Sequence, residues 1–494
     1  MNVGLSKNNS LNTTLMKPVS RYSWALIVGL LGYLFFILNP ESHFMDDPDS
    51  LLHISAGNWI FNHLSVPLVD PFSFNTAGKE WIDHEWLSQL ILAFAYYLGG
   101  FAGLKILTGA FFGITLGLQL RFVIQRVPPI YALLFSAFCF VSLQNHLLAR
   151  PHITTWPIII YWFSCLLQAC EEKKVPPYWL SLLMIIWANL HGSFLLGLLA
   201  IPFCALEAVM AADNKAAVAI AWIKFLLLSS AACLITPFGW KSYSFGVDLM
   251  SSPYITRIIE WAPATGFSLL SMEIWLGLLL ILGLLGRVRF SFGRLLLLLG
   301  LLHEALAHVR YISIFGLLAP LLLAAPFGIA YQSKLNGANA IDQFFNRLSS
   351  PCRSMTLLLS SSFLLMLSIW FTSLSVIKLD PVVAPKEALE AIKDYGIKGR
   401  VLNGYIFGGY LIFNQIPVFI DGRADLHGNP GNNDFYTFTD SADIEKIREL
   451  LDRHQIAWTI FQPTEKTVMY LNTQKDWKKI YEDSNSVVHV RVNQ

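Results

Sequence analysis

Charged residues are scarce in this sequence: only 14% of its 494 residues are Asp, Glu, Lys or Arg, and 54% are apolar. Soluble globular proteins carry roughly 25% charged residues, so this deficit, with a mean hydropathy of +0.51, excludes an ordinary soluble protein. The net charge is only +2 and no basic stripe stands out, which argues against nucleic acid as a partner. The six cysteines form no C-x-x-C pair, which argues against a disulfide framework or a cysteine metal site.

The charged residues that are present are unevenly distributed. Residues 378–494 hold 30 of the 68 charged residues, which leaves 38 for the first 377 residues. We therefore predict three parts: a cytoplasmic N-terminal tail over 1–21, a transmembrane domain over 22–377, and a soluble C-terminal domain over 378–494. The transmembrane domain includes a long first outer loop with surface helices over 40–100.

Apolar runs in the first part predict an α-helical polytopic membrane protein, because a crossing helix needs about 20 mostly apolar residues. We predict eleven spans, at 22–39, 101–120, 130–147, 153–170, 177–190, 193–212, 218–235, 268–286, 292–306, 311–330 and 355–377. If 86–98 lies on the membrane surface, 14 Lys and Arg residues fall on the side of the N-terminus and 5 on the opposite side. If 86–98 crosses the membrane instead, the N-terminal side holds 7 basic residues and the opposite side 12. Because basic residues are retained in the cytoplasm, we predict a cytoplasmic N-terminus and an external C-terminal domain.

Histidines and carboxylates gather on the predicted outer face. Of the 17 carboxylates in the first 377 residues, 8 lie in the first outer loop. All nine histidines of this region fall in outer loops or at outer ends of spans: His43, His53, His63, His84, His146, His152, His191, His303 and His308. Polar groups in a membrane setting are costly and usually mark a functional cavity, so we expect chemistry at this face.

The first outer loop begins with the acids of Asp46-Asp47-Pro-Asp49, directly after the first span. One hypothesis is that one of these acids is a general base, since such a base needs a carboxylate held near the attacking hydroxyl. The assisting residues would then be His53, His84 or Glu85. The alternatives are that Asp49 caps a helix while the other acids are solvated, or that Asp46, Asp49 and His84 hold a divalent cation.

The C-terminal domain reads as a small α/β unit. Helices are predicted over 385–396, 441–454 and 464–481, and strands over 399–402, 417–420, 457–461 and 486–492. The segment Asp421-Gly-Arg423-Ala-Asp425 follows a predicted strand, which is a usual place for binding residues in open α/β sheets. An equally weighted alternative is a local ion pair that stiffens a loop.

The patterns DPDxxxHIxxGxWI over 47–60 and PxxDPFSFxxxGxxWxxHEWL over 67–87 resemble a group of bacterial multi-pass membrane proteins described as glycosyltransferase-like. Further matches lie at 149–152, 187–192, 236–239, 260–261, 308–310, 399–404, 408–411 and 421–425. The wider resemblance is to GT-C fold glycosyltransferases, in which acids of the first outer loop follow the first span. The resemblance implies a polyprenyl-phosphate-linked sugar as donor, a plasma-membrane location, and Asp46 or Asp47 as base.

A lipid-phosphate leaving group needs cations near its oxygens. We expect the donor phosphate to lie near residues grouped at the outer ends of spans, namely Arg150, His152, His191, His303 and Arg310. The alternative is that each arginine extends to the membrane interface to keep its charge in water.

The leading prediction is therefore a membrane glycosyltransferase acting at the outer face. A lipid-linked saccharide transporter or flippase is the first alternative, although transporters place polar residues near the bilayer midplane. A non-enzymatic envelope assembly protein is the second alternative. The expected partners are the lipid-linked sugar and membrane lipid.

Overall fold

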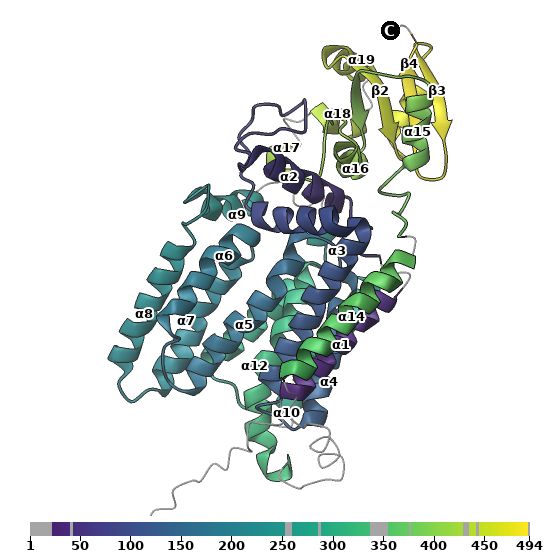
Figure 1. The fold of residues 1–494 in the computed structure, drawn as a ribbon. Coiled ribbons are helices and arrows are strands. Elements are labelled where there is room, and N and C mark those ends of the chain that lie inside the picture. The colour runs from purple at the N-terminus through teal and green to yellow at the C-terminus, as the bar shows by residue number, and fades with distance from the viewer. Residues whose placement is uncertain are drawn as a thin grey trace, which may run out of the picture.

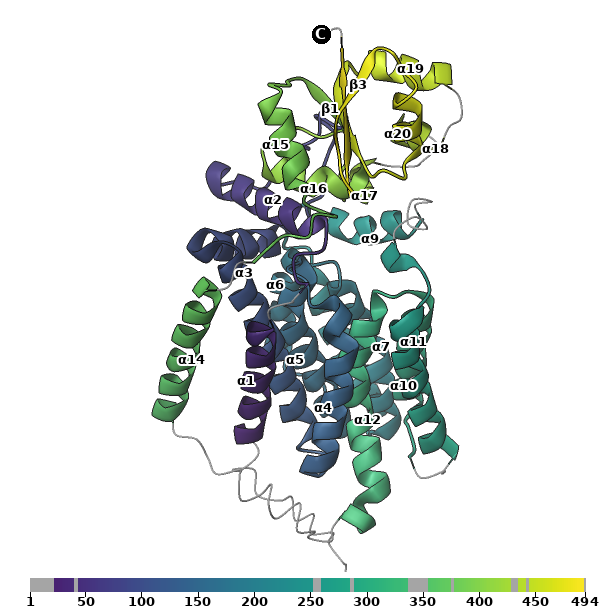
Figure 2. The ribbon, with the colours of Figure 1, turned by 90° about the vertical axis from the view of Figure 1, so that its right-hand side faces the viewer.

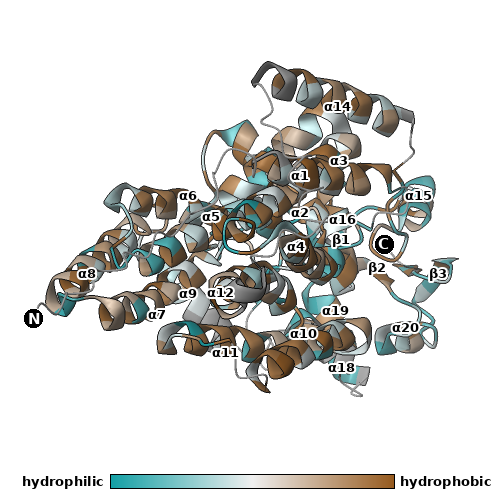
Figure 3. Ribbon diagram, turned by 90° about the horizontal axis from the view of Figure 1, so that it is seen from below, coloured by the Kyte–Doolittle hydropathy of each residue, from teal (hydrophilic) through white to brown (hydrophobic). Residues whose placement is uncertain are grey.

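The computed structural model describes residues 22–39, 43–251, 259–284, 288–335, 354–374, 377–427, 434–440 and 444–492. The N-terminal tail predicted over 1–21 and Cys352 lie outside these ranges. Long helices form a bundle, and shorter helices and a small sheet are stacked on one end of it (Figures 1 and 2). Seen from below, the bundle helices are mainly hydrophobic along their lengths (Figure 3).

A helix is present at each of the eleven ranges predicted to span the membrane. They are α1 (Tyr22–Leu38), the second half of α3 (Trp86–Val123), α4 (Pro129–Leu143), α5 (Pro151–Glu171), η3 with α6 (Tyr178–Leu182 and Leu183–Leu190), α7 (Phe194–Ala211), α8 (Lys215–Ala232), α10 (Gly266–Leu284), α11 (Phe292–Ala307), α12 (Tyr311–Leu335) and α14 (Ser354–Leu374). Six of the described helices are long and apolar enough to cross a membrane. The chain is thus a membrane protein, while the count of eleven crossings stays a prediction.

The first outer loop returns to the bundle through two helices that lie across its end (Figure 1). These are α2 (Asp49–His63) and the first part of α3. Helix α3 breaks at Gly99 and Gly100, where Gly100 has φ 56° and ψ −143°, a conformation that only glycine adopts readily. The break lets 86–98 lie across the end of the bundle before the chain turns into it. Its position on the membrane surface stays a prediction.

Helices α1 and α3 are held in close contact by small residues. A Cβ on Gly113 of α3 would lie 2.6 Å from the carbonyl oxygen of Gly29 of α1. Gly109 and Gly117 lie one turn to either side of Gly113 on the same helix. Such spacing lets helix backbones approach closely where the hydrophobic effect between helices is weak. This contact fixes the end of α1, from which the first outer loop starts.

The C-terminal unit contains a four-stranded sheet in the order β1-β2-β4-β3, with β1 and β2 parallel and the other pairs antiparallel. Its elements are α15 (Lys386–Asp394), β1 (Arg400–Asn403), η6 (Tyr405–Phe407), α16 (Gly408–Phe413), α17 (Ala424–His427), α18 (Asp434–Asp440), α19 (Ile444–Arg453), β2 (Ile456–Phe461), α20 (Lys466–Leu471), β3 (Trp477–Glu482) and β4 (Val487–Arg491). The predicted helix over 464–481 is wrong in its second half, where β3 pairs with β4. The predicted strand over 417–420 is also wrong.

Residues 417–420 instead pair with the first outer loop. Ser73 and Val418 form an isolated parallel bridge, in which the Val418 N–H donates to Phe72 O at 3.2 Å and the Phe74 N–H donates to Val418 O at 3.2 Å. The Ser73 hydroxyl donates to Phe419 O at 3.3 Å. The first outer loop thus provides the hydrogen-bond partners that a neighbouring strand would provide in a sheet. These contacts join the C-terminal unit to the bundle.

Candidate functional site

An arginine and three carboxylates from separate segments meet at the end of the bundle that carries α2. Arg150, just before α5, places its guanidinium 3.0 Å from Asp47 Oδ2 and 3.1 Å from Asp49 Oδ2. Glu260, in the turn η5 (Ile259–Trp261), pairs with the same guanidinium. Asp47 Oδ1 also accepts the backbone N–H of Asp49 at 2.8 Å. We call Asp47, Asp49, Arg150 and Glu260 the acid centre.

Two prolines direct the chain at this centre. Arg150 is extended (φ −124°, ψ 162°) because Pro151, the first residue of α5, disfavours a helical residue before it. Pro48 stands between the two aspartates, and α2 begins at Asp49. The Asp47 carboxylate therefore accepts the backbone N–H at the start of α2, whereas the Asp49 carboxylate accepts a hydrogen bond from Arg150.

Asp47, Asp49 and Glu260 share the single positive charge of Arg150, and their pKa values differ. Burial raises the pKa of Asp47, although Arg150 opposes the shift. Burial likewise raises the pKa of Asp49 to about 8, with Asp47 and Glu260 adding repulsion. Arg150 lowers the pKa of Glu260 to about 2, and Arg310 acts in the same direction. At neutral pH we expect a protonated Asp49 beside an ionised Glu260.

A second cluster surrounds Glu85, at the start of α3. Glu85 Oε1 lies 3.3 Å from His191 Nε2 and 3.7 Å from His84 Nε2, and Glu85 Oε2 lies 3.9 Å from His53 Nε2. The Ser193 backbone N–H donates to His191 Nδ1 at 3.0 Å, so the proton of a neutral His191 sits on the nitrogen that faces Glu85. Burial raises the pKa of Glu85 to about 7 and lowers the pKa of His53 and His191. Protons can be exchanged here near neutral pH.

Arg310 is a cation of a different kind. Its guanidinium lies 4.6 Å from the centre of the Trp261 ring, and its backbone N–H donates to Glu260 O at 3.1 Å. It is close enough to Glu85 and Glu260 to lower the pKa of both. Among the residues described, no carboxylate lies within ion-pair distance of Arg310, which distinguishes it from Arg150.

The remaining predicted residues are placed unevenly. Asp46 Oδ2 lies 2.5 Å from Nδ1 of the exposed His43, outside the Arg150 ion pairs. His152 Nε2 lies 2.9 Å from the His146 carbonyl oxygen, next to the acid centre. His303 is on an exposed face of α11 and has no recorded contact with either cluster.

Two predicted groupings are not assembled as expected. Arg150 was expected to hold a phosphate, but three carboxylates share its guanidinium. Asp46, Asp49 and His84 do not form a cation site: in the described part of the chain, no three His, Cys, Asp or Glu side chains are arranged to hold a metal ion. We derive no step through a metal.

The Asp421-Gly-Arg423 segment of the C-terminal unit is buried against the first outer loop. Arg423 donates to both carboxylate oxygens of Asp421, at 2.8 and 2.6 Å, and its Nη1 lies 2.7 Å from Asp70 Oδ1. The guanidinium also lies 4.6 Å from the centre of the Trp81 ring. The side chain of Asp425 is outside the described part. Asp421 and Arg423 thus form an ion pair that reaches across to the loop.

Gly422 brings this segment into direct contact with the acid centre. A Cβ on Gly422 would lie 1.7 Å from Asp49 Oδ1. In the neighbouring helix α16, a Cβ on Gly409 would lie 2.1 Å from Pro48 O. The C-terminal unit is therefore one wall of the acid centre.

Asp70→Asn should loosen this contact, because it removes the charge that Arg423 meets outside its own segment. We expect a loss of about 1.5–3 kcal/mol of docking free energy, measured as faster proteolysis between α14 and α15. The matched control is Glu449→Gln, which removes the exposed pair of Glu449 with Arg453 and should change the docking free energy by less than about 0.5 kcal/mol. Equal proteolysis of both variants would contradict the role of Asp70.

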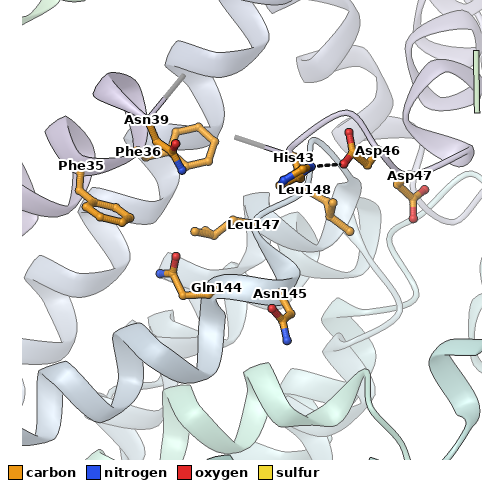
Figure 4. Close-up of a pocket in the computed structure, with 10 residues that line it drawn as sticks. All are labelled: Phe35, Phe36, Asn39, His43, Asp46, Asp47, Gln144, Asn145, Leu147 and Leu148. Atoms are coloured by element: carbon orange, nitrogen blue, oxygen red, sulfur yellow. Dashed lines mark hydrogen bonds and ion pairs between the residues drawn. The ribbon is translucent and has the colours of Figure 1, made fainter. Parts of the chain in front are cut away.

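A pocket of about 520 Å³ lies between the end of α1 and the turn η2 (Gln144–His146) and reaches the acid centre (Figure 4). Phe35, Phe36, Leu147 and Leu148 form its apolar part. The rest of its lining consists of Asn39, His43, Asp46, Asp47, Gln144 and Asn145. We call it the lipid-side pocket, because Phe35 is 48% exposed on the surface of an apolar helix.

The chain was compared with known families, proteins and structures. No family model matches the sequence, and no curated protein matches it. Among solved structures, it resembles the apo oligosaccharyltransferase of Archaeoglobus fulgidus (11% identity, TM-score 0.57, covering 89% of this chain and 69% of that one). It also resembles that organism's oligosaccharyltransferase AglB in complex with an inhibitory peptide and a dolichol-phosphate (10% identity, TM-score 0.56, covering 96% of this chain and 74% of that one). The chain has the GT-C fold. At this identity the likeness establishes the fold alone.

The GT-C fold confirms the predicted class, a helical membrane protein with a small C-terminal α/β unit. Within it, the site contains residues that were not predicted as functional. Glu260 pairs with Arg150, and Asp70 pairs with Arg423. Glu260 belongs to one of the motifs on which the resemblance rests, and this was the signal that could have identified it. Gly422 likewise belongs to a matching segment, 421–425, but a motif alone does not show that its Cα faces Asp49.

Proposed function

We propose that this protein is a glycosyltransferase that moves one sugar from a polyprenyl-phosphate donor to an acceptor hydroxyl. The proposal depends chiefly on one observation: Asp47 belongs both to the lipid-side pocket and to the ion pairs of the acid centre. It is supported by the GT-C fold, and by a structure of similar fold that binds a dolichol-phosphate. A site at a membrane surface suits a substrate whose sugar is polar and whose carrier is a lipid.

In the proposed reaction Asp47 accepts the proton of the acceptor hydroxyl. The acceptor oxygen then forms a bond with the anomeric carbon, while the bond from that carbon to the phosphate oxygen breaks and polyprenyl phosphate leaves with the electron pair. Arg150 and the Asp49 N–H orient the Asp47 carboxylate. Arg310 is the cation proposed to stabilise the charge that develops on the leaving phosphate.

The assay that tests the proposal uses the reconstituted full-length protein with a panel of radiolabelled polyprenyl-phosphate-linked hexoses. We expect release of polyprenyl phosphate, and we expect Arg310→Gln to lower the rate by about 10- to 100-fold through loss of a charge-assisted contact. Lys241→Gln is the matched control, because Lys241 pairs with exposed Glu80. No turnover of any panel member by the wild type would contradict the proposal.

The proposed orientation places the C-terminal unit and the acid centre on the external face. In a background whose native cysteines are replaced, Lys393→Cys in α15 should react with an impermeant maleimide added to intact cells. Lys173→Cys, after α5, should react only once the cells are opened. Both positions are exposed, so access depends on the membrane alone. Labelling of both in intact cells would refute the topology.

A further inference from the structure

The lipid-side pocket carries acidic groups at its polar end. Asp46 and Asp47 line it, and neither lysine nor arginine is among its described lining residues. The cations near the pocket already have partners: Arg150 contacts three carboxylates, including Asp47, and Lys105 donates to the Asn39 carbonyl oxygen at 2.7 Å. His43, which also lines the pocket, lies 2.5 Å from Asp46 Oδ2. A phosphate placed here would face two carboxylates, which is unfavourable because like charges repel strongly at short range.

The same pocket is well suited to an uncharged hydroxyl. Asn39, Gln144 and Asn145 add amide groups to its lining. The Gln144 amide donates to Phe140 O at 3.2 Å and the Asn145 amide donates to Ser268 Oγ at 3.3 Å, but an amide group has two N–H bonds and an acceptor oxygen. In Figure 4 Asn39 lies beside the phenylalanines of α1, Gln144 and Asn145 lie below Leu147, and His43, Asp46 and Asp47 lie at the other end of the pocket. A ligand that enters from α1 would therefore keep its chains against apolar side chains while its head group reached Asp47.

We propose that the lipid-side pocket is the acceptor site, and that the acceptor is a membrane lipid with an uncharged, hydroxyl-bearing head group. This rests on the proposed function and adds the class of acceptor to it. The donor phosphate would be bound by Arg310, which lies over Trp261 and is not among the described lining residues of the pocket. Donor and acceptor then meet at Asp47 by separate routes.

The experiment measures binding, so it needs no turnover and stays informative if the transfer assay fails. The full-length protein in nanodiscs is photolabelled with diacylglycerol that carries a diazirine near its glycerol. The matched probe is phosphatidic acid with the same chains and the same diazirine. We expect diacylglycerol to label the peptides around Asp47 and Leu148 about tenfold more than phosphatidic acid does, the equivalent of about 1.4 kcal/mol.

Two variants test separately whether labelling depends on the free volume of the pocket and on the negative charge of Asp46. Leu148→Trp should fill the pocket and lower diacylglycerol labelling about tenfold, the scale expected when a well-fitted site is overpacked, whereas Leu134→Trp, on the exposed face of α4, should not change it. Asp46→Asn should raise labelling by phosphatidic acid and leave that by diacylglycerol unchanged. Equal labelling by both probes, or labelling that Leu148→Trp leaves intact, would overturn the proposal. If Asp46→Asn leaves labelling by phosphatidic acid unchanged, the proposal that the head group must be uncharged is wrong.

Discussion

Asp47→Asn should lower sugar transfer by about 10²–10⁴-fold, the range that a positioned general base contributes. The substitution keeps the shape of the side chain but leaves it only one oxygen. The amide can therefore accept from either Arg150 or the Asp49 N–H, which contact different oxygens of the Asp47 carboxylate. The substitution removes the group that accepts the proton of the acceptor hydroxyl. The measurement is the initial rate of transfer at saturating donor, with the reconstituted wild type and variant compared at equal protein.

Two further variants are the controls for this prediction. Asp49→Asn should cost far less, because an Asp49 with a pKa near 8 is already neutral at pH 7, and an amide resembles its protonated form. Glu80→Gln removes an exposed acid of the same loop that pairs with Lys241 outside the acid centre, and it should keep full activity. Full activity of Asp47→Asn, or an equal loss in all three variants, would contradict the assignment of the base.

The pH dependence of the wild type follows from the same assignment. A base acts when it is deprotonated, and burial raises the pKa of Asp47. The rate should therefore rise with pH and reach its plateau above the range in which an ordinary aspartate ionises, near pH 4. Asp47→Asn should lose this rise, whereas a variant that only disturbs the fold would keep it at a lower level.

Sequence patterns located the helices and the polar face because both depend on local composition. Apolar runs gave the bundle helices, and the charge count placed 86–98 across the bundle, where Gly99 and Gly100 now explain the turn. The histidines His53, His84 and His191, which were predicted to share one face, do converge on Glu85. These features follow from residues near each other in the chain or from the membrane itself.

Contacts between segments far apart in the sequence could not be predicted from local composition. Nothing local to Arg150 shows that its partners are Asp47 and Glu260, each more than 100 residues away. The segment over 417–420 has the composition of a strand, yet it pairs with Ser73 of the first outer loop. The ion pairs of Arg150 with these acids become visible only when the contacts between distant segments are known.

Gly422→Ala should reduce transfer by about 10²-fold, the cost that a displacement of about 1 Å imposes on a catalytic arrangement. The added Cβ would lie 1.7 Å from Asp49 Oδ1. The segment cannot easily retreat, because Asp421 and Arg423 on either side are buried in their ion pair. Asp49 must then move away from Arg150, and Arg150 also orients Asp47. The matched control is Gly404→Ala, whose Cβ would meet its nearest neighbour at an ordinary 3.5 Å.

A double variant decides whether this loss comes from the contact itself or from general damage to the C-terminal unit. Asp49→Ala removes the carboxylate that the new methyl group would strike. In that background Gly422→Ala should therefore cost little further activity, so the two losses should be strongly non-additive. Proteolysis between α14 and α15 should be unchanged in all three variants, since the Arg423 contacts remain. A further 10²-fold loss on adding Gly422→Ala to Asp49→Ala would mean that Gly422 acts through folding of the unit and not by positioning the acid centre.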